Sequence, residues 1–311
     1  MARPLSLGRI IFKMTNKHSE GDEVQSVVSR QDLMMLTKAR LSTLVVVTTL
    51  FGYLLGAKKA GFDGWLLVHT LIGTILCACA AAVYNQILEI DSDRRMARTA
   101  DRPLAARRMA PEVAFVLGWI LAGLGILHLV MKVNFESSAL AAATIAVYIF
   151  IYTPLKSRSS TNTLVGAVSG ALPPLIGWAA AGRALMTLEA LFLFGLLFFW
   201  QLPHFLAINW LYREQYEKGG FVMWSNGDVS GKKTATLATM FSVMMLVFMF
   251  LPMVFGLATK NFIGAVICTG ILVYLSLQFY RRLDRSSARR LFFATLIYLP
   301  VILVIALISW R

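Results

Sequence analysis

Charged side chains are scarce in this sequence. Only 15% of its 311 residues are Asp, Glu, Lys or Arg, whereas 58% are hydrophobic, and the mean hydropathy is +0.68. This composition excludes a water-soluble globular protein, because a soluble domain of this length has no interior for so much apolar surface. We therefore expect most of the chain to lie in a lipid bilayer.

Cysteine is also scarce. The three cysteines, Cys77, Cys79 and Cys268, all lie in long apolar runs. On a helix, Cys77 and Cys79 would point to different faces. The pattern argues against a disulfide framework or a cysteine metal site and favours small packing residues.

Long apolar runs, in contrast, are abundant. A transmembrane helix needs about 20 mainly apolar residues, and the sequence has about nine such runs. They lie at residues 38–57, 65–88, 111–131, 137–155, 162–182, 187–210, 234–257, 262–280 and 291–310. Because they use most of the chain, we predict an all-α polytopic membrane protein with no separate soluble domain.

Acidic residues are about half as frequent as basic ones, which gives a net charge of +14. Such a charge can indicate nucleic-acid binding. However, 24 of the 30 Lys and Arg residues lie in the amino-terminal arm and in alternate loops. This asymmetry follows the positive-inside rule. We therefore expect no nucleic-acid partner, a cytoplasmic amino terminus and a carboxyl terminus on the opposite side.

Residues 1–33 are predicted to form a flexible cytoplasmic arm, and residues 34–311 a single transmembrane domain. The first nineteen residues contain four basic residues and no acidic one, and they lack the apolar core of a cleaved signal peptide. Their composition is mildly similar to that of a mitochondrial transit peptide. The interpretation that we favour is a disordered arm near anionic membrane lipid.

Glycine and proline indicate how the fifth apolar run packs. Gly166 and Gly170 have the spacing that allows helices to approach closely in lipid. Pro173 and Pro174 should break or kink this helix. A kink is tolerated in lipid only where protein or a cavity covers the freed carbonyl groups, so we infer a cavity near this break.

Charge of both signs is concentrated at the end of the second apolar run. Asn85, Glu89 and Asp93 are spaced by four residues and would lie along one face of a helix, whereas Asp91 falls on another face unless the helix unwinds. Amide and carboxylate oxygens are ligands that suit Mg²⁺, which also binds phosphate. These residues predict a magnesium site at the membrane surface.

Basic residues follow directly after these oxygen donors, namely Arg94, Arg95, Arg98 and Arg102. Their guanidinium groups suit phosphate oxygens. Anion donors beside cation ligands indicate that a metal–diphosphate complex binds here. A network of internal salt bridges is the alternative, and spacing alone leaves both open.

A second cluster closes the sixth apolar run, in the stretch WQLPHFLAINWLYREQYEK. His204 and Asn209 lie near the membrane end of this helix, where polar groups are costly and usually functional. An ordinary interhelical hydrogen bond is the alternative for His204. Arg213 and Glu214 add a cation and a carboxylate immediately after the helix.

A third cluster is the stretch YTPLK at residues 152–156, which places Lys156 at the same interface. Alone, Lys156 would be explained as a snorkelling lysine. Because three clusters converge on one side of the membrane, we predict that they form one site.

Together these motifs resemble those of the UbiA-type intramembrane prenyltransferases. Asn85-x3-Glu89-x3-Asp93, followed by RTADRPL, resembles the first aspartate-rich motif of that superfamily. The stretches WQLPHF, REQY, YTPLK and GALPPLIGWAA resemble its heme-farnesylating branch, and LTKARL resembles the entry to that branch's first helix. The likeness extends from about residue 34 to the carboxyl terminus.

The resemblance implies nine transmembrane helices around a central cavity, with both acidic motifs facing the cytoplasm. It implies transfer of a farnesyl group from farnesyl diphosphate to a vinyl carbon of heme B, which gives heme O for respiratory oxidases. The implied cofactor is Mg²⁺, and the implied downstream partners are heme A synthase or oxidase assembly proteins. The implied location is the bacterial inner (plasma) membrane, or the mitochondrial inner membrane in a eukaryote.

The resemblance also assigns roles to individual residues. The implied catalytic and metal-binding residues are Asn85, Glu89, Asp91, Asp93, Arg98, Lys156 and Glu214. The implied substrate-binding residues are Arg94, Arg102, Tyr152, Trp200, Gln201, His204, Arg213 and Tyr216, of which Trp200, Gln201 and His204 would contact the porphyrin. Three positions depart from the family pattern. Glu89 replaces the commoner Asp, and Ala39 replaces the usual Pro in the LTKARL stretch. Gln215 replaces the Asp before Tyr216, so one metal ligand is either missing or supplied by Glu214.

Two alternatives remain. A UbiA-type prenyltransferase could instead use an aromatic or quinone precursor, although the WQLPHF stretch favours heme. A non-catalytic heme-binding or transport protein would carry charges in the middle of its spans. Here the charge is concentrated at one interface, which argues against that class.

Overall fold

The computed structural model describes residues 28–310. Within this range nine helical spans are long and apolar enough to cross a membrane, which confirms the predicted all-α membrane class. The spans are α3 (Ala39–Ala60), α4 (Gly64–Leu88), α6 (Pro111–Lys132), α7 to α8 (Phe135–Leu155), α9 and α10 (Asn162–Ala180), α11 (Leu188–Leu211), α13 and α14 (Lys232–Val254), η2 and α15 (Lys260–Arg282) and α16 (Arg285–Ser309).

Four of these spans are interrupted. The pieces are α7 (Phe135–Ala146), the π-helix η1 (Val147–Tyr152) and α8 (Thr153–Leu155); α9 (Asn162–Ala171) and α10 (Pro173–Ala180); α13 (Lys232–Phe248) and α14 (Leu251–Val254); and the 3₁₀-helix η2 (Lys260–Phe262) and α15 (Ile263–Arg282). The π-helix ends at Tyr152, the first residue of the YTPLK stretch. Such turns are frequent at functional sites.

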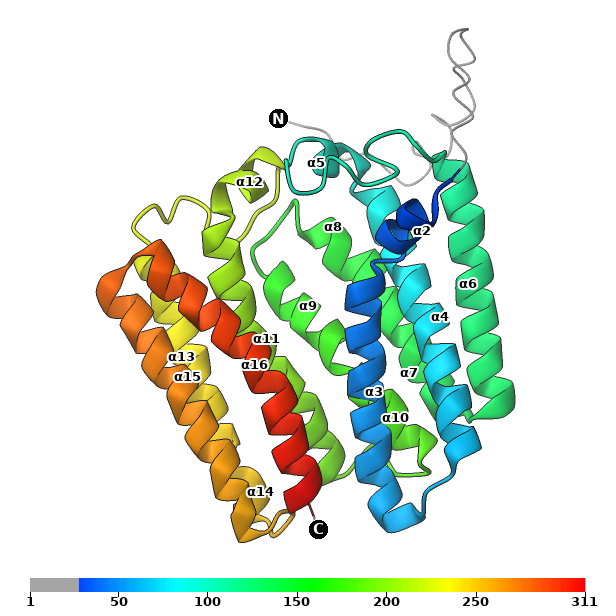
Figure 1. Ribbon diagram of the computed structural model, residues 1–311, viewed down its shortest axis with the longest axis vertical. Helices are drawn as coiled ribbons and strands as arrows, with labels where there is room; N and C mark the ends of the chain where they lie inside the picture. The colour runs from blue at the N-terminus through cyan, green and yellow to red at the C-terminus, as the bar shows by residue number, and fades with distance from the viewer. Residues whose placement is uncertain (1–27, 311) are drawn as a thin grey trace, which may run out of the picture.

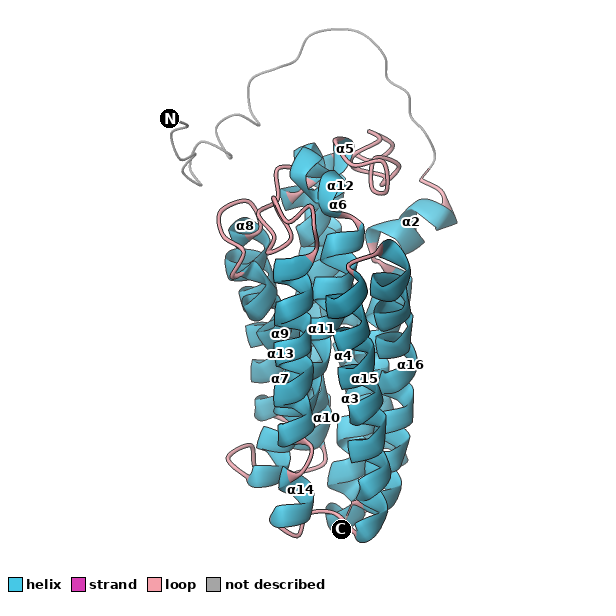
Figure 2. Ribbon diagram, turned by 90° about the vertical axis from the view of Figure 1, so that its left-hand side faces the viewer, coloured by secondary structure: helices cyan, strands magenta, loops and turns pink. Residues whose placement is uncertain are grey.

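The long helices run side by side along the length of the molecule (Figures 1 and 2). The short helices α2 (Arg30–Leu36), α5 (Ile90–Arg94) and α12 (Arg213–Lys218) gather at one end, and α14 lies at the other (Figure 1). We call the first of these the α5/α12 end. The helices do not fix which end faces the cytoplasm, so the predicted orientation stays a prediction.

The last span starts earlier than expected. We predicted its start at residue 291, but α16 begins at Arg285, after Asp284 caps the helix by accepting a hydrogen bond from the Ser287 amide (2.7 Å). The basic stretch before residue 291 is therefore the first part of the helix rather than a loop. Exposed arginines can occupy this part because their aliphatic stems extend toward the interface.

The beginning of the described chain is helical. Ser29 and Asp32 form a capping box at the start of α2, and Asp32 also pairs with Arg108 at 2.8 Å. The predicted boundary between arm and domain, at residue 33, therefore falls inside α2. The rest of the predicted arm, residues 1–27, lies outside the described residues.

The predicted break at Pro173-Pro174 is present, because α9 ends at Ala171 and α10 begins at Pro173. Thr49 of α3 donates a hydrogen bond to the Pro173 carbonyl at 3.1 Å. The neighbouring helix thus satisfies a polar group near the break, as a span in lipid requires.

Glycines allow α3 and α10 to touch through their backbones. A Cβ atom on Gly52 would lie 1.9 Å from the Pro174 carbonyl oxygen, and one on Gly177 would lie 1.9 Å from the Thr49 carbonyl oxygen. Without side chains at these positions, the helices approach more closely than other residues would permit. This contact fixes the broken span against the first one.

We expect Gly52→Ala to lower the free energy of unfolding by about 1–3 kcal/mol, because the added methyl group forces α3 and α10 apart. The matched control is Gly123→Ala in α6, where a Cβ atom meets nothing within 4 Å. That change should stabilise the helix by about 1 kcal/mol. Denaturation of the purified protein in mixed micelles measures both changes. Equal stability of the two variants would contradict the close contact.

Candidate active site

A polar cavity of about 280 Å³ lies below the α5/α12 end. Its charged and polar lining comes from segments far apart in the sequence. These residues are Lys38, Glu89, Asp93, Arg98, Thr99, Arg102, Tyr152, Lys156, Asn162, Thr163, His204, Asn209 and Tyr216. The structure thus brings together residues from all three clusters that the sequence analysis predicted to meet.

An apolar cavity of about 230 Å³ adjoins the polar one. The two share Lys38, Leu41, Tyr152 and Phe205 as lining residues. The walls of the apolar cavity include small residues of α4 and α9, among them Ala78, Ala81, Ala82, Gly166 and Gly170. The site therefore consists of a polar, charged cavity and an apolar cavity that share part of their walls.

The helical spacing of Asn85, Glu89 and Asp93 continues past the end of α4. The Glu89 amide donates to the Asn85 carbonyl (3.1 Å), and the Asp93 amide donates to the Glu89 carbonyl (2.7 Å). The three side chains consequently point inward, and all three residues are at most 5% exposed. In contrast, the Asp91 side chain is 81% exposed and contacts Arg94 at the surface.

Every inward-facing carboxylate is held by a cation. Lys156 Nζ lies 2.7 Å from Glu89 Oε1, and Arg102 Nη1 lies 3.9 Å from Glu89 Oε2. Arg102 also donates to both oxygens of Asp93, at 2.7 and 2.8 Å. In a nearly dry site such compensation is required, because an unpaired buried charge is very costly.

Lys38 is a site residue that the sequence analysis did not select. It directly precedes α3 in a left-handed conformation (φ 47°), and its ammonium donates to the Asn85 side-chain oxygen. The Asn85 amide nitrogen in turn donates to Thr153 at 3.1 Å. The stretch LTKARL contains Lys38, so the motif was noticed, but nothing in the spacing placed its side chain near Asn85.

Burial and charge act in opposite directions on the pKa values of these groups. Burial alone would raise the pKa of Glu89, but Lys156 and Lys38 outweigh it and hold this pKa below its ordinary value. For Asp93, burial outweighs Arg102, so the pKa lies above its ordinary value. Burial and the nearby Arg102 lower the pKa of Lys38 to about 7.

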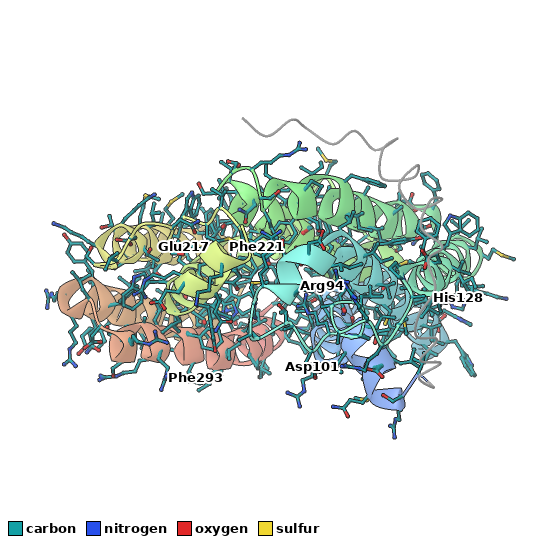
Figure 3. All side chains as sticks on the ribbon, turned by 90° about the horizontal axis from the view of Figure 1, so that it is seen from above. Arg94, Asp101, His128, Glu217, Phe221 and Phe293 are labelled. Atoms are coloured by element: carbon teal, nitrogen blue, oxygen red, sulfur yellow. The ribbon has the colours of Figure 1, made fainter. Side chains whose placement is uncertain are left out.

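Tyr216 brings the segment after α11 into the site. Its hydroxyl accepts a hydrogen bond from Arg98 at 3.3 Å, and the Arg98 guanidinium lies 5.5 Å from the centre of the Tyr216 ring. Phe221 follows on the same segment and lies 5.5 Å from the Lys156 ammonium. In the view onto the α5/α12 end, Phe221 and Arg94 lie near the middle of the molecule (Figure 3).

Other predicted residues of the second motif lie elsewhere. The Arg213 guanidinium packs over the Trp210 ring at 5.0 Å and reaches Glu214 at 3.5 Å, and the Glu214 side chain is 72% exposed. Neither residue lines the polar or the apolar cavity. The predicted roles of Arg213 and Glu214, like those of Asp91 and Arg94, stay predictions that this placement does not support.

The three residues expected to contact a porphyrin have different surroundings. His204 lines the polar cavity, and its Nδ1 lies 2.9 Å from the Thr295 hydroxyl. Gln201 lines the apolar cavity and donates to the Leu197 carbonyl at 2.9 Å. Trp200 is buried, stacks on His204 and donates to the Thr295 carbonyl at 2.8 Å. It lines neither cavity, and its contact with the His204 ring helps to fix the orientation of that ring.

The oxygen donors fit a magnesium ion that is shared with phosphate. Within residues 28–310, no group of three or more His, Cys, Asp or Glu side chains could hold a metal ion. Two carboxylates, from Glu89 and Asp93, line the polar cavity, whereas Asn85 is not among its lining residues and reaches it through Lys38, which donates to the Asn85 side-chain oxygen. Mg²⁺ in proteins is commonly bound by one or two carboxylates, with phosphate oxygens and water completing the octahedron.

Comparisons with known proteins agree with the motifs. Residues 45–298 match the model of the UbiA prenyltransferase family. The chain is 42% identical to a protoheme IX farnesyltransferase of Opitutus terrae, over 88% of this chain and 92% of that protein. It is 38% identical to the mitochondrial protoheme IX farnesyltransferase of Homo sapiens, over 90% of this chain and 62% of that protein.

Solved structures show the same fold. A digeranylgeranylglyceryl phosphate synthase matches with a TM-score of 0.74 at 16% identity, over 90% of this chain and 97% of that one. A UbiA homologue from Archaeoglobus fulgidus, bound to GPP and Mg²⁺, matches with a TM-score of 0.60 at 11% identity, over 88% and 99% of the two chains. At these identities the likeness concerns the fold alone.

The Glu89–Lys156 pair should be strongly coupled. We expect Lys156→Met to lower the free energy of unfolding by about 3 kcal/mol, because it removes the nearest compensating charge from a buried carboxylate. Adding Glu89→Gln should restore most of this loss. A double-mutant cycle in chemical denaturation measures the coupling. The Arg213–Glu214 pair, whose carboxylate is 72% exposed, is the control and should couple by less than about 1 kcal/mol. Similar couplings for both pairs would contradict this account.

Proposed function

The chain belongs to the UbiA prenyltransferase family, and on that premise we propose that it transfers the farnesyl group of farnesyl diphosphate to a vinyl carbon of heme B, forming heme O. The observation that carries the proposal is the direct contact between a cation-rich polar cavity and an apolar cavity. The first suits a diphosphate, and the second suits a prenyl chain. The acceptor is suggested by relatives named protoheme IX farnesyltransferase.

The diphosphate would bind among the cations of the polar cavity. Lys156, which follows α8, provides an ammonium donor, and Arg98 and Arg102 of the loop after α5 provide guanidinium donors. Asn85, Glu89 and Asp93 would hold Mg²⁺, which supplies charge neutralisation for the leaving diphosphate. When the complex binds, Lys38 can exchange its hydrogen bond to Asn85 for one to a phosphate oxygen.

The reaction begins with cleavage of the bond between farnesyl C1 and the diphosphate oxygen, whose electron pair leaves with the diphosphate. Lys156 and the arginines stabilise the charge that develops on this oxygen. The allylic cation that remains would be captured by water if water were present. The apolar cavity excludes water, and the Tyr152 ring, which lines both cavities, offers its π face to the cation.

The new carbon–carbon bond forms when the vinyl π electrons of heme B attack farnesyl C1. The positive charge then moves to the vinyl carbon next to the porphyrin ring. A water molecule adds at that carbon and loses a proton, which completes the hydroxyethylfarnesyl group. His204 lines the polar cavity, and its Nδ1 contacts Thr295. Its other ring nitrogen, Nε2, would therefore be the one available to accept the proton that this water loses.

The test uses the purified full-length chain in lipid nanodiscs, supplied with heme B, farnesyl diphosphate and Mg²⁺. Extracted hemes are separated by hydrophobicity and weighed by mass spectrometry. We expect heme O from the native protein, and a loss of at least about 100-fold in rate with Asp93→Asn, because the amide lacks the charge that would hold Mg²⁺, and a bound metal supplies several kcal/mol of stabilisation to the leaving group.

Asp91→Asn is the matched control, since this carboxylate belongs to the same short helix but its side chain is 81% exposed. It should retain nearly full activity. If farnesyl diphosphate is consumed while heme B returns unchanged, the acceptor is wrong and an aromatic or quinone precursor becomes the better candidate. If neither substrate changes, the farnesyltransferase proposal fails.

The apolar cavity should select the length of the prenyl chain. Ala78 lines this cavity, and Ala78→Phe would fill part of it. We expect this variant to use farnesyl diphosphate at least about tenfold less well, and the shorter geranyl diphosphate comparatively better, because overpacking costs about 1–3 kcal/mol. Ile72→Phe, on an exposed face of the same helix, should leave the use of both diphosphates unchanged. Unaltered length preference in Ala78→Phe would place the prenyl chain elsewhere.

A further inference from the structure

A third cavity, of about 970 Å³, opens between the start of the described chain and the loop after α5. We call it the outer cleft. All of its charged lining residues are cations, and they are Arg30, Lys38, Arg40, Arg98 and Arg102. Five positive groups around one cleft create a strong attraction for anions.

Four of these five cations have no carboxylate in ion-pair range among the described residues, and two of the four, Lys38 and Arg98, donate instead to the neutral side chains of Asn85 and Tyr216. Arg102 pairs with Asp93, but no carboxylate within residues 28–310 lies in ion-pair range of Arg30 or Arg40. Arg30 starts α2 and Arg40 lies in the first turn of α3, and both are exposed. Their guanidinium groups are free to donate paired hydrogen bonds to carboxylates.

Apolar side chains lie between these cations. Met34 lines the outer cleft and is 51% exposed, and Met35 and Leu41 line it as well. Methionine side chains are flexible and polarisable, so they adapt to flat, irregular apolar surfaces. The outer cleft thus combines an apolar wall with cations, which suits an amphiphilic anion better than a free phosphate.

The outer cleft leads into the polar cavity. Lys38, Leu41, Arg98 and Arg102 line both spaces, whereas Arg30 and Arg40 line only the outer cleft. Arg30 and Arg40 therefore lie away from the edge that the two spaces share. A ligand held by Arg30 and Arg40 would extend toward the place where the diphosphate is proposed to bind.

We propose that the outer cleft binds heme B, with Arg30 and Arg40 receiving its two propionates and Met34 packing against the macrocycle. The porphyrin carries its propionates on two adjacent pyrrole rings and its vinyl groups on the other two. Anchoring the propionates at the outer arginines therefore turns the vinyl edge toward the polar cavity. This assignment rests on the proposed function, because it names the site of that reaction's acceptor.

The test compares heme B with its dimethyl ester, in which both carboxylates are masked. The full-length protein in nanodiscs is titrated with each heme, and binding is followed by the change in heme absorbance. Arg30→Gln/Arg40→Gln is the test variant. Arg158→Gln is the control, because this arginine is exposed and lines none of the three cavities.

We expect the test variant to bind heme B about 10- to 100-fold more weakly, since two charge-assisted interactions are lost. The dimethyl ester should bind the native protein as weakly as heme B binds the variant, and the variant should not discriminate between the two hemes. The KM for farnesyl diphosphate should stay unchanged, and Arg158→Gln should behave as the native protein does.

Either of two results would overturn the proposal. One is heme B binding to the test variant with native affinity. The other is an equal weakening of heme B and ester binding in the variant, which would show that the arginines do not act through the propionates. Binding is measured separately from turnover. If the native protein binds heme B and the test variant binds it more weakly, but no heme O forms, the proposed function is refuted and the outer cleft assignment stands.

Discussion

Charge compensation at one end of an apolar bundle is the interaction on which this structure depends. Glu89 and Asp93 are almost completely buried, and they are tolerable there only because Lys156 and Arg102 lie against them. Glu89, Asp93 and Arg102 precede α6 in the sequence, whereas Lys156 follows α7. Their pairing therefore links two segments of the chain at the α5/α12 end. The same ion pairs that stabilise the fold would be rearranged when a metal and a diphosphate enter.

The second constraint is the position of the apolar cavity. It begins where the polar cavity ends, at Lys38, Leu41, Tyr152 and Phe205. An amphiphilic substrate would therefore be bound with its charged group and its chain in separate environments. This separation places the bond to be cleaved at the boundary, where cations stabilise the leaving group and water is excluded from the carbon.

The helices were predictable from the sequence because a bilayer requires long apolar runs, and each of the nine predicted runs corresponds to a span of the described residues. The inward face of the first motif was predictable for a related reason. Helical hydrogen bonds continue through Glu89, so the four-residue spacing holds and Asp91 points to solvent. Local periodicity therefore gave both the fold class and the central carboxylates.

Tertiary contacts decided the rest, and no local pattern encodes them. Lys38 reaches Asn85 from 47 positions away because its left-handed backbone turns the chain between α2 and α3. Glu214 was selected for its charge, but α12 leaves its side chain in solvent. Gln201 follows Trp200 directly, yet the two face different neighbours, because only Gln201 lines a cavity.

We propose that Asn85, Glu89 and Asp93 hold a divalent cation together with a prenyl diphosphate. The most direct measurement is anomalous diffraction from crystals grown with Mn²⁺ and farnesyl thiodiphosphate, which resists ionisation. We expect one anomalous peak within coordination distance of the Glu89 and Asp93 carboxylates and of the diphosphate oxygens. A peak at the exposed carboxylates of Asp91 or Glu214 instead, with the diphosphate analogue bound but no metal in the polar cavity, would contradict it.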